Sequence, residues 1–163
     1  MYFSKLAMSL TLTTAVILGG CATAPEPQSI VETAAATPQL STLTKLINDA
    51  GLTETLKEPG PFTVFAPTDD AFKAVPAKTL DALSKDKALL ISVLTYHVLP
   101  GKKVTSADVQ NGPATTVHGA PVSLYRSGTF VTVESAVVTT ADIEASNGVV
   151  HIIDTVLIPP VKK

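Results

Sequence analysis

Three histidines are the side chains best suited to metal or acid–base chemistry in this chain of 163 residues. His97, His118 and His151 lie in separate segments, and no two of them have H-x-H or H-x-x-x-H spacing. Because histidine metal ligands often come in such closely spaced pairs, the pattern predicts no metal site. His97 follows an apolar helical pattern, and we interpret it as a structural histidine that bonds backbone groups.

Two acidic residues stand where a carboxylate could be structural or catalytic. Asp69 follows Pro67-Thr68 at a predicted helix start, where a carboxylate meets unpaired N–H groups and the positive end of the helix dipole. Asp154 lies in the apolar final segment and must be paired with a donor if it faces inward. We interpret both as structural, with a catalytic acid as the alternative.

Sequence motifs typical of enzymes and nucleotide-binding proteins are absent. The chain has no G-x-S-x-G, no H-E-x-x-H, no G-x-G-x-x-G and no P-loop. Its formal net charge is −2, so it lacks the basic surface of a nucleic-acid binder. The sequence therefore predicts a non-enzymatic protein with no cofactor and no nucleic-acid partner. An enzyme that joins His97, Asp69 and Asp154 in one cleft remains a rival hypothesis.

The amino terminus has the pattern of an export signal. Lys5 is followed by an apolar stretch over residues 6–18 and then by Gly19-Gly20-Cys21. One early positive charge, a short apolar core and small residues before a break are typical of secretory signals. The apolar core is shorter than the roughly 20 residues of a spanning helix, although an uncleaved anchor remains an alternative.

The segment Leu18-Gly19-Gly20-Cys21 resembles the lipobox of bacterial lipoproteins. In that family the cysteine is lipidated and the signal is cut before it, so Cys21 is the expected lipid attachment site. Several acyl chains anchor a protein stably, whereas one holds it only marginally. Ala22 follows the cysteine in place of the Asp that marks inner-membrane retention in many such lipoproteins. The resemblance therefore implies an exported protein in the cell envelope, at the outer membrane where there are two.

The chain is expected to divide into a signal, a tether, a domain and a tail. Residues 1–20 are the expected signal, and residues 21–29 are small, polar and rich in proline, as in a flexible tether. Residues 30–160 are the expected domain, and residues 161–163 a tail.

Within the domain, helical patterns precede strand patterns. Ser29 opens a capping box, Leu40 to Ala50 keep helical spacing up to Gly51, and Asp86 is suited to cap another apolar helix. Residues 62–66 read as a strand, and residues 149–158 as a central strand covered on both faces. Tight turns are expected at His118-Gly119, Ser127-Gly128 and Asn147-Gly148. Helices followed by strands predict an α+β fold.

Three segments together resemble the fasciclin (FAS1) domain. Residues 62–72 resemble its first conserved box, residues 96–101 its Tyr-His motif, and residues 147–159 its second box. The three occur in the family's order and cover nearly all of the expected domain. The resemblance implies a twisted β-sandwich or wedge with helices packed on one side, and an extracellular adhesion module that is not an enzyme.

The resemblance also supplies candidate binding residues. In animal FAS1 proteins, integrin binding is associated with the segment around a Tyr-His pair and with an Asp-Ile pair. The matching positions here are Tyr96, His97, Asp142 and Ile143. A bacterial surface protein has no obvious integrin partner, so we favour scaffold roles for both pairs over contact roles.

The function predicted from the sequence is non-covalent recognition at the cell envelope. The expected partners are the membrane, through the lipid on Cys21, and a surface protein or a polysaccharide. A periplasmic carrier of small ligands is the alternative, and it requires a deep apolar pocket of roughly 300 Å³ or more. Lys102-Lys103 is interpreted as a solvated charge pair, with a weak contact to an anion as the alternative.

Overall fold

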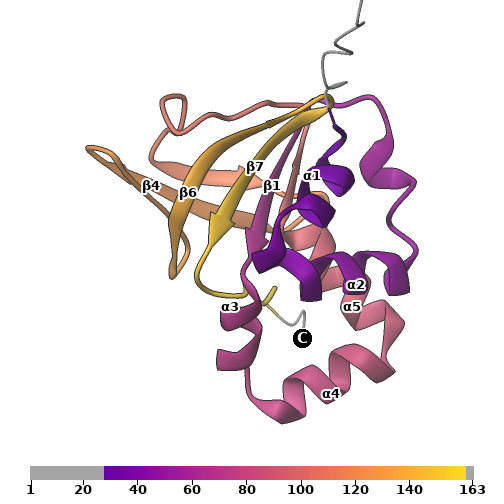
Figure 1. Ribbon diagram of the computed structural model, residues 1–163. Helices are drawn as coiled ribbons and strands as arrows, with labels where there is room; N and C mark the ends of the chain where they lie inside the picture. The colour runs from indigo at the N-terminus through magenta and orange to yellow at the C-terminus, as the bar shows by residue number, and fades with distance from the viewer. Residues whose placement is uncertain (1–27, 161–163) are drawn as a thin grey trace, which may run out of the picture.

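Helices and a curled sheet divide the chain between them in the computed structural model, which describes residues 28–160 (Figure 1). The predicted α+β class is confirmed. The expected signal, the lipidation site Cys21, most of the tether and the tail 161–163 lie outside the described residues. Ser29 is the N-cap of the first helix, and the Gln28 carbonyl accepts a 2.8 Å hydrogen bond from Ser146 N, so the fold begins slightly before the expected boundary at Ile30.

The helices begin and end at residues whose chemistry favours these positions. They are α1 (Ile30–Ala36), η1 (Pro38–Leu40), α2 (Ser41–Ala50), η2 (Thr55–Lys57), α3 (Asp69–Ala74), α4 (Ala77–Lys85) and α5 (Lys87–Tyr96). Ser29 forms the predicted capping box, and the Asp86 side chain accepts the first free N–H groups of α5. Gly51 ends α2 in the left-handed conformation, at φ 75°.

Seven strands form one sheet that curls towards a barrel. They are β1 (Phe62–Pro67), β2 (Val98–Pro100), β3 (Gly112–Thr115), β4 (Pro121–Ser127), β5 (Phe130–Val133), β6 (Ala136–Ala145) and β7 (Gly148–Ile153). Their order is β2-β1-β7-β6-β5-β4-β3, and only the β1–β7 pair among them is parallel. The predicted strand at residues 62–66 is confirmed, whereas the final strand ends at Ile153 and not at Ile158.

The central strands β1 and β7 carry a hydrophobic core on each face. Val64 and Val150 face the helices, and Figure 1 shows α1 and α2 packed along that side. Phe65 and Ile153 face the opposite side, where the inner faces of β4 and β5 close over them. Every residue of β7 is buried, as expected for a strand covered on both faces.

The tight turn predicted at Asn147-Gly148 is present but lies one residue earlier in the chain. The hairpin loop between β6 and β7 consists of Ser146 and Asn147, because Gly148 is already paired with Ala145. A Cβ atom on Gly148 would lie 2.0 Å from the Phe62 carbonyl oxygen, so glycine is required there for close approach of β1.

The Asn147 side chain ties this hairpin to the helical half. Its Oδ1 accepts a 3.0 Å hydrogen bond from Ile30 N, and its Nδ2 donates to the carbonyls of Leu56 and Glu58, at 2.7 and 3.0 Å. One side chain therefore fixes the start of α1, η2 and the residue after η2 against the end of the sheet.

We predict that Gly148→Ala lowers the free energy of unfolding by about 3 kcal/mol or more, because the added methyl group meets backbone that cannot move aside. Gly128→Ala is the matched control. The Cβ there would meet no atom within 4 Å, so only the left-handed φ of 63° should matter, at about 1 kcal/mol. Urea unfolding of both variants measures the difference, and equal losses would contradict the packing argument.

Candidate functional site

His97 is a buried structural histidine at the end of α5. Its Nδ1 lies 2.7 Å from the Val93 carbonyl oxygen, and its Nε2 accepts a 3.0 Å hydrogen bond from Leu157 N. Since an acceptor at Nε2 requires a neutral ring, Nδ1 carries the proton and donates to Val93. Burial lowers the pKa of His97 to about 4, although the Val93 carbonyl favours the protonated form. The ring thus joins α5 to the segment after β7.

Tyr96 is also directed inward. Its side chain is 3% exposed, its hydroxyl donates to the Pro121 carbonyl at 3.1 Å, and its ring meets His118 edge to face. Burial and the nearby Glu134 carboxylate raise the pKa of Tyr96, which keeps the phenol protonated. With Tyr96 and His97 both buried, the structure favours the scaffold role for this pair, and a contact role remains an untested prediction.

The Asp142-Ile143 pair divides between the surface and the core. Asp142 is exposed, adopts a left-handed φ of 59° at an irregularity in β6, and accepts hydrogen bonds from the backbone N–H, at 2.7 Å, and the hydroxyl of Ser106. Partial burial opposes ionisation, but the Ser106 bonds outweigh it and hold the pKa of Asp142 below its usual value. Ile143 packs against the helical core.

Asp69 caps a helix, but not the one that its position in the sequence indicates. Its carboxylate accepts 2.8 Å hydrogen bonds from Thr42 N and the Ser41 hydroxyl at the start of α2. Slight burial alone would raise the pKa of Asp69, but these bonds lower it. The start of α3, its own helix, is capped by Thr68.

Asp154 is exposed, which corrects the prediction of a position within the buried final strand. The strand has ended at Ile153, and the Asp154 carboxylate accepts a 2.8 Å hydrogen bond from Val137 N. His97, Asp69 and Asp154 therefore bond to different segments and share no partner. The rival hypothesis of a cleft formed by these three groups finds no support in this geometry.

A segment for which the sequence predicted no helix or strand frames the candidate site. Residues 101–111, here called the strap, cross the face of the sheet that carries Phe65 and Ile153. Buried polar side chains of that face form hydrogen bonds with the backbone of the strap. The Thr63 hydroxyl donates to the Lys102 carbonyl and accepts from Val104 N, both at 2.8 Å. His151 Nε2 lies 2.7 Å from the Val104 carbonyl oxygen. Thr63 and His151 are 0% and 1% exposed, so both form their hydrogen bonds with the strap from inside the fold.

The His151 ring is the tautomeric counterpart of His97. Its Nδ1 accepts from Asp142 N at 3.3 Å, so Nε2 carries the proton that bonds Val104, and the ring stacks on Phe65. Burial lowers the pKa of His151 against the opposing effects of the Val104 carbonyl and the Asp142 carboxylate. The neutral ring thus links β6, β7 and the strap.

The strap is also tied at its outer edge. Asp142 holds Ser106, Lys103 forms a 2.8 Å ion pair with Glu144, and Arg126 donates to the Ala107 carbonyl at 2.6 Å. These contacts with β6 and β4 leave the strap fixed on both sides. The backbone beside it is therefore a rigid wall suited to binding without rearrangement.

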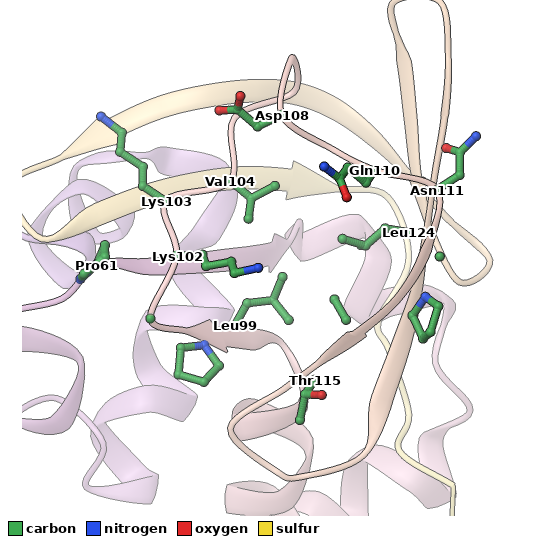
Figure 2. Close-up of a pocket in the computed structure, with 15 residues that line it drawn as sticks. Pro61, Leu99, Lys102, Lys103, Val104, Asp108, Gln110, Asn111, Thr115 and Leu124 are labelled. Atoms are coloured by element: carbon green, nitrogen blue, oxygen red, sulfur yellow. The ribbon is translucent and has the colours of Figure 1, made fainter.

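A groove of about 830 Å³ lies between the strap and the two outermost strands of the sheet (Figure 2). Strands β2 and β3 end the strand order and contact each other, but no ladder joins them in the described residues. A 2.8 Å hydrogen bond from Val117 N to the Val98 carbonyl closes one end of the gap between β2 and β3. The walls are formed by Pro61, Leu99, Pro100, Gly101, Lys102, Lys103, Val104, Asp108, Gln110, Asn111, Gly112, Pro113, Ala114, Thr115 and Leu124.

No periodic pattern in the sequence reveals this groove. Its floor comes from Leu99 in the short strand β2, Val104 in the strap and Leu124 in β4, three segments that are separate in the sequence. The only signals were the adjacent Lys102-Lys103 pair and the two prolines, Pro100 and Pro113, that bracket the strap. The groove has Lys102, Lys103 and Asp108 as its charged residues, and this set does not resemble an acid–base pair at a reacting centre.

Comparison with known proteins identifies the family to which this fold belongs. The family model of the fasciclin domain matches residues 38–159, and the chain belongs to the fasciclin family. It is 47% identical over 136 residues to protein sll1483 of Synechocystis, covering 81% of this chain and 74% of that protein.

A relative and a solved structure extend the comparison. The chain is 41% identical to the cell surface glycolipoprotein MPB83 of Mycobacterium bovis, over 82% of this chain and 62% of that protein. The FAS1 domain pair of the insect cell adhesion molecule Fasciclin I has the same fold, with a TM-score of 0.65 and 18% identity, over 81% of this chain and 51% of that one. The expected FAS1 fold is thus confirmed.

Two further properties concern residues 28–160 only. Among them no group of three or more His, Cys, Asp or Glu side chains is arranged to hold a metal ion. None of the helices in that range is long and apolar enough to cross a membrane.

We predict that acidification from pH 7.5 to 5 destabilises the protein, by roughly 2 kcal/mol through His97 alone. The ordinary pKa of 6.5 applies to the unfolded chain, and the folded value is about 4. The unfolded state therefore binds the proton first, so stability is full above about pH 6.5 and is lost as the pH falls towards 4. His151 adds to the loss in the same direction.

Urea unfolding at a series of pH values measures this slope in the protein, in His97→Gln and in the control His118→Gln. The slope should shrink in His97→Gln and persist in the control. NMR titration of the His97 ring in the unsubstituted protein gives a second readout. A ring that titrates near pH 6.5 would overturn the assignment.

Proposed function

We propose that this protein is a lipid-anchored, non-catalytic recognition module of the cell envelope. The observation that carries the proposal is that the potentially reactive side chains form hydrogen bonds within the fold. His97, His151 and Asp69 are engaged in internal hydrogen bonds, while an open groove with rigid walls remains available. FAS1 relatives include a cell adhesion molecule and cell surface glycolipoproteins, which supports a surface role.

The anchor in this proposal is the lipid on Cys21. It rests on the segment Leu18-Gly19-Gly20-Cys21 and is supported by the name of the mycobacterial glycolipoprotein relative. The proposed location is the outer membrane, which is supported by Ala22 at the position where many such lipoproteins carry a retention Asp. The partner would be a surface protein or a polysaccharide. Many tethered copies would engage it together, so that modest individual affinities multiply.

A second candidate function, a carrier of small ligands, is favoured by the groove itself. Its volume of about 830 Å³ exceeds the roughly 300 Å³ set for such a role, but the groove is half open and is not the deep apolar pocket that the prediction from the sequence required. Its floor is apolar and its rim polar, as in many small-molecule sites. This candidate is compatible with the same anchor and the same absence of catalysis.

We predict that Cys21→Ala releases the protein from membranes, because no acyl chain can then be attached. Membrane fractionation with a salt wash and a detergent extraction measures the distribution. Replacement of Ala22 by Ser, which keeps the cysteine, is the matched control and should leave the protein bound. Retention of Cys21→Ala on the membrane, with the signal removed, would contradict the anchor.

The recognition role is tested by crosslinking on intact cells that carry the lipidated protein. Capture of one surface protein or polysaccharide in stoichiometric amount would support the proposal. A chain released by Cys21→Ala serves as the comparison, since loss of avidity should reduce capture. If crosslinking on intact cells captures no specific product and a small molecule is found in the groove, the carrier function is favoured instead.

A further inference from the structure

The groove does not have the properties of a site for strand addition. Its two edges are strands of only three and four residues, β2 and β3, and each contains a proline. Pro100 and Pro113 carry no N–H group, and both lie in the groove wall. Short edges and prolines are how sheets prevent pairing with another chain. An occupant must therefore bind through side-chain contacts rather than through a backbone ladder.

The floor of the groove is suited to an apolar body. Leu99 and Leu124, each 4% exposed, come from β2 and β4, and Val104 comes from the strap. Figure 2 shows these three side chains converging on the same space from different elements. Because the second hydrophobic core packs behind them, the floor is firm and its apolar surface is preformed.

One cation is directed into this apolar space. Figure 2 shows Lys102 extending across the groove between Val104 and Leu99, whereas the ammonium of Lys103 points away. Lys103 is neutralised by Glu144 at 2.8 Å. Within residues 28–160 the ion pairs shorter than 4.0 Å do not include Lys102.

The remaining charge in the wall limits the kind of anion. The Asp108 carboxylate lies at the rim, where it accepts a 2.7 Å hydrogen bond from the Thr105 hydroxyl. A ligand with several negative charges would be repelled there, whereas a single charge can pair with Lys102. Neutral side chains, Gln110 and Thr115, complete the polar rim.

We propose that the groove binds a single-chain carboxylate, with the apolar chain on Leu99, Val104 and Leu124 and the carboxylate at Lys102. This inference rests on the carrier function proposed above and names its ligand class. The half-open groove keeps the ion pair partly hydrated, so one ammonium is sufficient to hold the carboxylate.

The test uses cis-parinaric acid, a fatty acid whose fluorescence rises in apolar surroundings, and its methyl ester. The protein is a chain that begins at Ala22, which retains both cores and every tie of the strap and carries no lipid of its own. The acid should bind about tenfold or more tightly than the ester, since the charged hydrogen bond is lost in the ester.

Three variants locate the effect. Lys102→Met should weaken binding of the acid about tenfold and leave the ester unchanged, while Lys102→Arg should retain the preference. Lys85→Met is the matched control, because it removes one positive charge from α4, outside the groove lining and the ties of the strap. Equal losses in Lys102→Met and Lys85→Met would overturn the assignment to Lys102.

The outcomes separate this inference from the function on which it rests. Equal binding of acid and ester would overturn the carboxylate preference but leave a carrier of apolar molecules. Preferred binding of dodecyl phosphate over dodecanoate would also overturn it, in favour of a phosphate ligand. If no amphiphile binds, the carrier function itself fails, while the anchor and the recognition role are unaffected.

Discussion

The parallel pairing of β1 with β7 is the constraint on which the rest of the structure depends. Six residue pairs join these strands, from Phe62 with Gly148 to Pro67 with Ile153. Alternate residues of both strands supply the two hydrophobic cores, so neither core exists without this pairing. A one-residue shift in the register of β7 would turn the side chains that face the helices toward the barrel side, and the reverse. The close approach of Gly148 to β1 prevents such a shift.

The same pairing explains why polar residues are buried at the centre of the sheet. Thr63 lies on the barrel face of β1, and His151 on that face of β7, and both bond the strap. Without them the backbone of the strap would leave unpaired groups against an apolar face. His97 makes the corresponding link between the end of α5 and the segment after β7. Two neutral histidines of opposite tautomer therefore hold that segment, the strap and the irregularity in β6.

Local chemistry made much of the fold predictable. The capping box at Ser29, the stop at Gly51 and the cap at Asp86 each involve residues within four positions of one another. The family boxes at residues 62–72 and 147–159 correspond to the central strands and their flanks. These elements were predicted because their determinants are near in sequence.

Long-range partners account for what the sequence did not predict. Asp69 caps a helix that begins 28 residues earlier, and Asn147 bonds Ile30 across 117 residues. The strap and the groove depend on Thr63, His151 and Asp142, whose partners lie 36 to 47 residues away. No spacing rule encodes such contacts, so the candidate site became visible only when the strands were placed side by side.

The position of the groove connects the proposed anchor with the proposed ligand. Gln28 enters the domain bonded to Ser146, the next residue Asn147 accepts from Phe62 N, and the adjacent Pro61 lines the groove. If Cys21 carries the lipid, six residues lie between it and Gln28, and the seven steps of the chain span at most about 25 Å. The end of the groove beside Pro61 would then lie on the side of the domain that is tethered to the membrane surface. Single-chain carboxylates partition into that surface, so an anchored groove would meet them at far higher local concentration than in bulk water.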